Sequence, residues 1–147
     1  MQEYPHHYRA SATGRIQGAV RIASPQLPSL ETAPPPEYGG DPGYWSPETL
    51  LVAAVADCFV LSFRAVARGS GLAWDELACD VEGTLERVDR VTRFTGFDLS
   101  ARLRIADPDS RDKAMRCLEK AEQVCLITNS LTGGTTLHCQ IDTAPPA

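Results

Sequence analysis

The sequence lacks any run of basic residues. Its 14 lysines and arginines are outnumbered by 19 aspartates and glutamates, which gives a net charge of -5. Proteins that bind nucleic acids or anionic membranes carry basic patches, so we expect neither partner. The N-terminal segment 1–10 lacks the apolar core of a signal or transit peptide. The longest apolar run is too short for a membrane span and carries Asp57. These absences favour a cytoplasmic protein whose partners are small molecules or proteins.

Cysteines are few and widely spaced, at positions 58, 79, 117, 125 and 139. Because five is an odd number, disulfides within the chain cannot include every cysteine. The spacing is also not that of a secreted disulfide scaffold. No CxxC pair is present, and the three histidines are not spaced to complete a zinc site. We therefore expect no metal, and thiol chemistry is a better first interpretation than structural disulfides. A chain of 147 residues is long enough to form one domain, 1–147, with its own core.

A long helix is predicted over residues 46–68. Ser46 is a good N-cap residue, a proline occupies the first helical position, and Glu48 complements the helix dipole. Between residues 50 and 63 the only charged side chain is that of Asp57. A helix that is apolar all round is normally buried, so we expect this central helix to be covered on nearly all sides.

The remaining patterns predict mainly strands. Glycine and proline breaks, alternating apolar residues and helical apolar stripes give these elements in chain order: a hairpin within 1–24, a Pro/Gly-rich loop over 25–45 with a short edge strand near 27–31, a hairpin over 78–105, a second helix over 108–125 and a last strand over 135–143. Such a mixture predicts an α+β fold with antiparallel sheets wrapped around the central helix. His138 falls on the outward phase of the last strand, so we expect it to be exposed.

The apolar phases of these elements also place the cysteines. Cys79 and Cys139 fall on inward strand positions, and Cys117 falls on the apolar stripe of the second helix together with Ala114, Leu118, Ala121 and Val124. Each of the three is most simply a small buried hydrophobic residue. Cys58 interrupts the central helix beside an acidic residue, and Cys125 marks a break after the second helix. Periodicity alone still favours a structural role for these two.

The arrangement resembles the OsmC/Ohr family of osmotically inducible and organic hydroperoxide resistance proteins, which are thiol peroxidases. Three motifs carry the resemblance: Gly14-Arg15 in the first hairpin, SPETLLVAAVADCF with Glu48 ten residues before Cys58, and CLITNSL with Cys125. The order of the predicted elements also fits, and the similarity covers nearly the whole chain. The chain is closer to the OsmC-like branch than to typical Ohr enzymes.

The resemblance implies a function and a set of site residues. Cys58 would be the peroxidatic thiol and Cys125 the resolving thiol, while Arg15 would stabilise the thiolate and the peroxide, and Glu48 would orient Arg15. It implies an intertwined homodimer, hydroperoxide as substrate, no bound cofactor, and a small dithiol or lipoylated protein as reductant. A thiolate is the nucleophile in peroxide reduction, and an unperturbed cysteine titrates near ~8.5, so the chemistry requires such a cation.

Two positions depart from the family pattern. Leu126 follows Cys125 where family members often have proline, and Asp57 stands before Cys58 where a small residue is common. A neighbouring negative charge opposes ionisation of a thiol, although consecutive helical side chains point about 100° apart. These departures bear on reaction rate and substrate range rather than on the class of reaction.

Helix geometry limits how the site could be assembled. In a straight helix Glu48 and Cys58 lie ~15 Å apart along the axis, so one arginine does not readily bridge them. Either the helix is broken between them, or one group comes from a second chain.

Two alternative functions on the same fold stay open. One is a non-catalytic protein that binds an apolar ligand between Tyr38, Tyr44, Trp45 and Phe59, the residues we otherwise expect to line the substrate pocket. The other is a thiol redox sensor.

Overall fold

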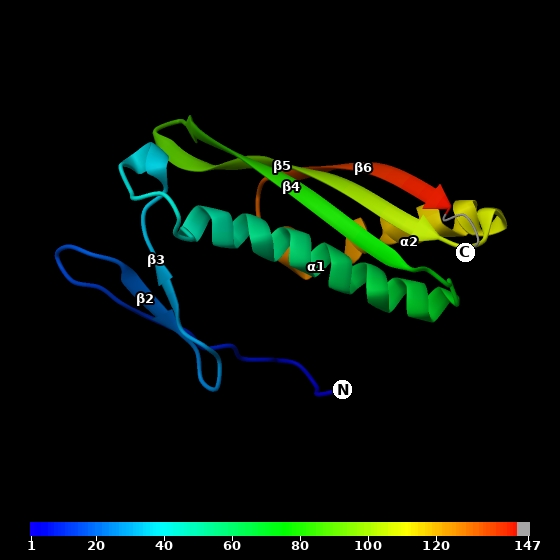
Figure 1. Cartoon of the computed structure of the whole chain (residues 1–147), viewed down its shortest axis with the longest axis horizontal. Helices are drawn as coiled ribbons and strands as arrows, with labels where there is room; N and C mark the ends of the chain where they lie inside the picture. The colour runs from blue at the N-terminus through cyan, green and yellow to red at the C-terminus, as the bar shows by residue number, and fades with distance from the viewer. Residues whose placement is uncertain (144–147) are drawn as a thin grey trace. The chain divides into compact units, whose positions relative to one another are not determined.

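A computed structural model describes residues 1–143 (Figure 1). These residues form two compact units, which divide between Leu51 and Val52, inside the first long helix. Each unit has its own three-stranded sheet. The mixed α+β class predicted from the sequence is confirmed, while the assignment of 1–147 to one domain stays a prediction.

The first unit contains the predicted N-terminal hairpin and edge strand. Strands β1 (Ser11–Thr13), β2 (Val20–Ala23) and β3 (Leu30–Thr32) form an antiparallel sheet in that order. The loop from β3 to the first helix contains one short 3-10 turn, η1 (Pro36–Tyr38). Arg15 lies in the exposed loop between β1 and β2.

Helix α1 (Pro47–Ser70) begins directly after Ser46, as the capping residues predicted it would. The backbone N–H of Thr49 donates to Ser46 Oγ at 3.1 Å, which satisfies one of the amides left unpaired in a first helical turn. The helix ends at Ser70. The next residue is Gly71, whose φ of +67° lies in the left-handed region that glycine adopts without a Cβ penalty.

Only one stripe of α1 is buried. Its members recur every four residues, at Val55, Phe59, Phe63 and Ala67. The prediction that α1 is covered on nearly all sides is therefore wrong for the single chain: Leu61, for example, is 48% exposed. Composition indicated that the other faces are apolar, but burial depends on which elements pack there.

By length and composition alone, α1 would also pass for a membrane-spanning helix. The prediction that this apolar run is too short to span a membrane is therefore wrong. The core helix of a protein that folds in water passes the same test.

In the second unit, β4 (Glu76–Val88) and β5 (Val91–Ile105) form the predicted hairpin. Its two turn residues, Asp89 and Arg90, both have positive φ, as a tight hairpin turn requires. The inward face of β5 supplies much of the core, at Phe97, Leu99, Ala101, Leu103 and Ile105. The alternating residues face away, so the helices cover only one face of this sheet (Figure 1).

The chain then enters η2 (Pro108–Ser110), capped by the Asp107 carboxylate, which accepts from Asp109 N at 3.0 Å. Helix α2 (Arg111–Val124) follows, and it buries the predicted stripe at Ala114, Cys117, Leu118 and Ala121. Val124 departs from that prediction, because it is exposed at the last residue of the helix.

Helix α3 (Leu126–Asn129) and β6 (Gly134–Thr143) complete the unit. Strand β6 pairs with β5 in parallel, so the prediction of purely antiparallel sheets is wrong at this edge. The reason is the α2 crossover, since a helical connection returns the chain to the sheet in the same direction. Sheet β4–β5–β6 is therefore mixed.

Candidate thiol site

Cys58 lies in the middle of α1 and is half-buried. Its sulfur is 3.9 Å from the hydroxyl oxygen of Ser62, one helical turn further along the same face. The preceding residue, Asp57, is exposed. The thiol is thus neither on the open surface nor sealed in the core.

Cys125 lies at the break between α2 and α3. Its backbone is extended, with φ -64° and ψ 106°, which interrupts the helix. Its carbonyl accepts hydrogen bonds from Thr128 Oγ1 at 3.1 Å and from Asn129 N at 3.0 Å. These bonds fix the break, and the Cys125 side chain is buried within it.

The fold brings Cys58 and Cys125 together, although 67 positions separate them in the sequence. Burial is the main cause that raises the pKa of Cys125, and the neighbouring Cys58 thiol raises it further, whereas the hydroxyl and backbone amide of Thr128 lower it. The effect of Cys58 on that pKa requires the two thiols to be close. Cys58 on α1 and Cys125 at the α2–α3 break are therefore neighbours in the folded chain.

The other three thiols have different surroundings. Cys79 on β4 and Cys139 on β6 flank Ala101 in one row across the sheet, so two strand spacings, about 10 Å, separate them. That distance excludes a disulfide between them without backbone movement. Burial and the Asp80 carboxylate raise the pKa of Cys79 to about 12. Cys117 is buried on α2. All five cysteines are unpaired.

Arg15 and Glu48 belong to the first unit. Within residues 1–143 no ion pair joins them, and Glu48 Oε1 is a buried carboxylate oxygen with no hydrogen-bond partner. Helix α1 is continuous from Pro47 to Ser70, which excludes the broken helix as a way of bringing Glu48 to Cys58. The two side chains stay ~15 Å apart along the axis.

The aromatic residues expected at a substrate pocket divide into two groups. Tyr38, Tyr44 and Trp45 are exposed side chains of the first unit. Phe59 is 0% exposed in the core of the second unit, so it is a packing residue of α1 and presents no surface to a ligand in the single chain.

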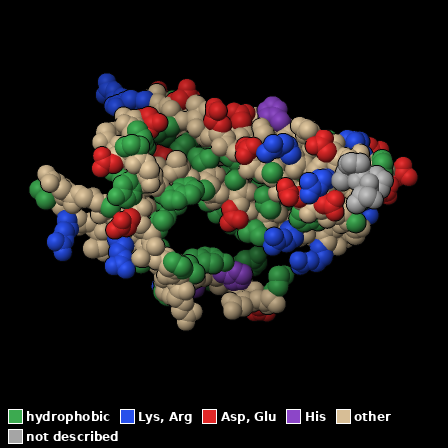
Figure 2. All heavy atoms as spheres, viewed as in Figure 1, with side chains coloured by type: hydrophobic (Ala, Val, Ile, Leu, Met, Phe, Trp, Pro, Cys, Tyr) green, Lys and Arg blue, Asp and Glu red, His purple; other side chains and the backbone are tan. Residues whose placement is uncertain are grey.

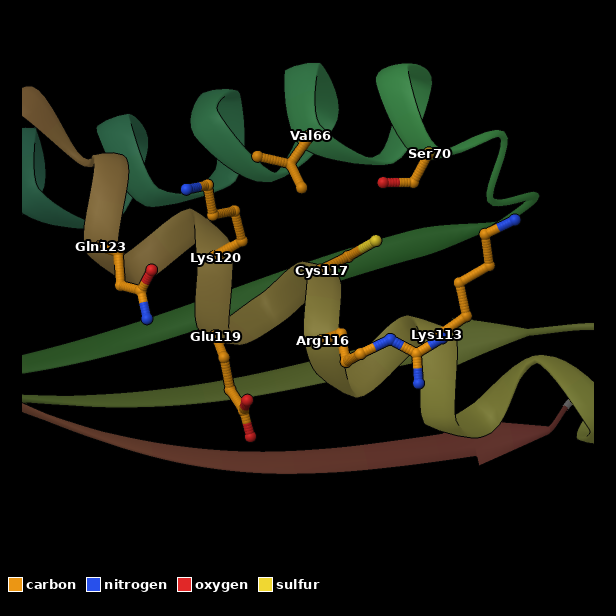
Figure 3. A pocket seen from close by; sticks show the side chains of 8 residues that line it. All are labelled: Val66, Ser70, Lys113, Arg116, Cys117, Glu119, Lys120 and Gln123. Atoms are coloured by element: carbon orange, nitrogen blue, oxygen red, sulfur yellow. The ribbon is translucent and has the colours of Figure 1, made fainter.

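A groove of about 400 Å³ runs between α1 and α2. Figure 3 shows Cys117 directed toward α1 between Val66 and Ser70, while Lys113 and Lys120 extend toward opposite ends of the groove. The cations therefore do not converge on one point. Neither this groove nor a second hollow of about 500 Å³ between α2 and β6 is lined by Cys58 or Cys125.

Acidic and basic side chains are intermingled over the visible face of the second unit (Figure 2). His138, predicted to be exposed, lies on the outer face of β6, 3.9 Å from Asp98. Among residues 1–143, no three histidine, cysteine, aspartate or glutamate side chains gather as a metal-binding group.

Ser62 and Thr128 are site residues that the sequence analysis missed. The contact between Cys58 and Ser62 could have been predicted from their spacing of four residues, because such pairs share a helix face. Thr128 had no comparable signal, since its contact with Cys125 depends on the break after α2.

The mixed sheet and the long helix define an α+β protein in which two free thiols, Cys58 and Cys125, are neighbours. A profile described as OsmC-like protein matches residues 39–140. The chain belongs to the OsmC/Ohr family. An organic hydroperoxide resistance protein of Xanthomonas axonopodis pv. citri is 33% identical over 128 residues, which cover 84% of this chain and 85% of that protein.

Solved structures agree with this assignment. An organic hydroperoxide resistance protein from Legionella pneumophila has a TM-score of 0.74 and 26% identity, with 95% of this chain and 99% of that chain covered. An OsmC-like protein of unknown function from Vibrio cholerae has a TM-score of 0.82, covering 92% of this chain and 100% of that chain. Its identity is 15%, so it supports the fold alone.

Proposed function

We propose that this chain is a thiol-dependent hydroperoxide reductase in which Cys58 is the peroxidatic residue and Cys125 the resolving residue. The observation that carries the proposal is that Cys58 lies near enough to Cys125 to raise the pKa of the Cys125 thiol. Relatives named as organic hydroperoxide resistance proteins support the same reaction class.

The proposed cycle has three steps. The Cys58 thiolate attacks the terminal peroxide oxygen and the O–O bond breaks, giving a Cys58 sulfenic acid and, after uptake of one proton, the alcohol. The Cys125 sulfur then attacks the Cys58 sulfur, and the hydroxyl leaves as water to give a disulfide. An external dithiol reduces that disulfide by thiol–disulfide exchange and is itself oxidised.

Arg15 is proposed to supply the positive charge that this chemistry requires. A guanidinium can donate hydrogen bonds to the thiolate and to the peroxide oxygens. A carboxylate that forms an ion pair with the guanidinium can fix its orientation. The buried, unpartnered Glu48 Oε1 fits that last role, because a buried carboxylate oxygen without a donor is costly.

The continuity of α1 supports a proposed homodimer. Since Glu48 and Cys58 are separated along α1, we propose that Arg15 and Glu48 of one protomer meet the thiol pair of its partner. The half-exposed apolar faces of α1, including Leu61, would then be covered by the second copy. Such an intertwined dimer would complete each active site from two chains.

The substrate is proposed to be an organic hydroperoxide, with hydrogen peroxide as a second substrate. Tyr38, Tyr44 and Trp45 would supply an apolar wall for its organic group, and their exposure in the single chain leaves them available for this. The reductant would be a small dithiol or a lipoylated protein. The proposed enzyme works in the cytoplasm and needs no bound cofactor.

The direct test mixes reduced protein with cumene hydroperoxide and dithiothreitol and follows peroxide concentration. An enzyme consumes peroxide continuously, a redox sensor consumes about one equivalent, and a non-catalytic ligand-binding protein consumes none. Only the first result supports the proposal. The matched control is Cys58→Ser, which should consume none while keeping the far-UV circular dichroism of the parent.

Mass spectrometry tests the proposed intermediate. After one equivalent of peroxide, the protein should lose the mass of two hydrogens, and a digest should contain a peptide linking positions 58 and 125. Cys125→Ser should instead retain a sulfenic acid at Cys58 that dimedone traps. A linkage to Cys79, Cys117 or Cys139 would contradict the assignment of Cys125.

A further inference from the structure

The surroundings of the Cys58 sulfur contain one hydroxyl group on the same helix. Ser62 Oγ lies 3.9 Å from Cys58 Sγ, within the range in which a sulfur atom accepts a weak hydrogen bond. The spacing of four residues places both side chains on one face of α1. Both are half-buried, so bulk water screens the contact only in part.

The Ser62 hydroxyl has no competing partner in the described chain. Serine inside a helix commonly donates to the carbonyl four residues earlier. Within residues 1–143, the Cys58 sulfur is the only partner found for this hydroxyl. Its proton can therefore turn toward the sulfur at no cost to another hydrogen bond.

The charge state of the sulfur decides what that contact does. A neutral thiol gains little, because either atom can donate and both are weak partners. A thiolate carries no proton, so the Ser62 hydroxyl must be the donor, and a hydrogen bond to a charged acceptor is the stronger kind. Hydrogen bonding to the charged form favours ionisation.

We propose that Ser62 is a positioning residue for Cys58, donating a hydrogen bond that stabilises and orients the thiolate on α1. The inference deepens the proposed function in that it takes Cys58 as the reacting thiol. It adds a donor from the same chain and the same helix as that thiol, which needs no second protomer to be in place.

The test measures thiolate formation without peroxide. Fully reduced protein is alkylated with iodoacetamide between pH 5 and pH 10, and the rate of modification at Cys58 is followed by peptide mass. Ser62→Ala should shift the midpoint of the rate–pH curve to higher pH and lower the rate at pH 7 about 3- to 10-fold, the range expected for one lost hydrogen bond. Ser62→Thr, which keeps the hydroxyl, should stay within twofold of the parent.

The controls separate this role from a structural one. Alanine is the best helix former, so Ser62→Ala should fold, and an unchanged melting temperature together with a shifted curve supports the proposal. Ser70→Ala, in the last turn of α1, should leave the curve unmoved. Superimposable curves for Ser62→Ala and the parent would overturn the inference, as would a parent Cys58 that iodoacetamide fails to modify up to pH 10.

The outcome is independent of turnover. Alkylation uses neither hydroperoxide nor dithiol, so a shifted curve in a protein that consumes no peroxide would keep the role of Ser62 and refute the peroxidase. If the protein consumes peroxide but Ser62→Ala leaves the curve unshifted, the peroxidase proposal stands and the role of Ser62 is refuted.

Discussion

Five thiols in one small chain are distinguished by their surroundings. Cys58 lies near a serine hydroxyl and a second thiol, Cys125 lies at a backbone break, and Cys79 is half-buried on β4 next to Asp80 in the sequence. Because only the thiolate is an effective nucleophile, these environments assign different reactivities to chemically identical groups.

The raised pKa of Cys125 predicts how disulfide closure depends on pH. Below a raised pKa the thiolate is the minor form, and its fraction grows about tenfold for each pH unit. The closure rate should therefore keep rising as pH increases from 6 through 9. The measurement starts from a mixed disulfide between Cys58 and thionitrobenzoate. It follows the release of this bound thionitrobenzoate when Cys125 closes the disulfide, and the Cys125→Ser variant should show no such release. A closure rate that is flat above pH 7 would contradict the raised pKa.

Cys79 should be nearly inert to alkylation. With a pKa of about 12, its thiolate fraction at pH 8 is only about one in ten thousand. Native protein treated with iodoacetamide at pH 8 should leave Cys79 unmodified for hours, whereas protein unfolded in guanidinium chloride should react at all five cysteines. Rapid native modification at Cys79 would show that its strand is not covered as described.

At the scale of elements, tight packing of α1 on β4 explains one glycine. A Cβ built at Gly83 would lie 2.9 Å from Val52 Cγ2 and 3.1 Å from Phe94 Cε1. Real side-chain contacts are rarely so short, and valine is stiff about its first torsion, so helix and strand would have to shift. The glycine therefore sets how closely α1 approaches the hairpin.

Gly83→Ala should lower the free energy of unfolding by about 1–3 kcal/mol through overpacking. The matched control is Gly69→Ala within α1, where an added Cβ meets nothing within 4 Å. That change should raise the free energy of unfolding by about 0.5–1 kcal/mol, because alanine loses less chain entropy in a helix. Urea denaturation of the two variants beside the parent measures both. Equal stability in all three would refute the close approach.

At the scale of the whole molecule, the proposed dimer makes a prediction about mixed subunits. Arg15→Ala and Cys58→Ser should each be inactive alone. Heterodimers assembled from the two by co-expression should regain up to half of the parent activity, because one of their two sites combines Arg15 from one protomer with Cys58 from its partner. Two tags, purified in sequence, isolate the heterodimer for the peroxide assay.

Two controls accompany that experiment. Sedimentation velocity of the parent at micromolar concentration should show a dimer, and a stable monomer would contradict the proposed assembly. Heterodimers as inactive as the two homodimers would mean that Arg15 and Cys58 of the same chain form the site.

Local patterns predicted the elements well for physical reasons. Ser46 caps α1 because the capping interaction is made within three residues, and β5 buries alternate residues because strand side chains alternate by geometry. The parallel pairing of β6 was not predictable in this way, since strand direction depends on the path of the α2 crossover. Val124 was predicted to lie on the apolar stripe of α2. It is exposed because α2 ends at this residue.

The candidate site was only partly predictable from the residues. Periodicity could not separate Cys58 and Cys125 from structural cysteines, and the family resemblance was needed to name them. Their closeness became visible only when α1 and the α2–α3 break were packed together. Ser62 could have been found from its helical spacing, whereas Thr128 could not.

By itself, the sequence determined the capped central helix, the apolar face of β5 and the set of cysteines, because short-range sterics, hydrogen bonds and side-chain periodicity act within a few residues. Only the tertiary structure decided which cysteines become neighbours, which stripe of α1 is buried and in which direction β6 runs. Those outcomes depend on contacts between segments far apart in the chain, and no local pattern encodes which segments will meet.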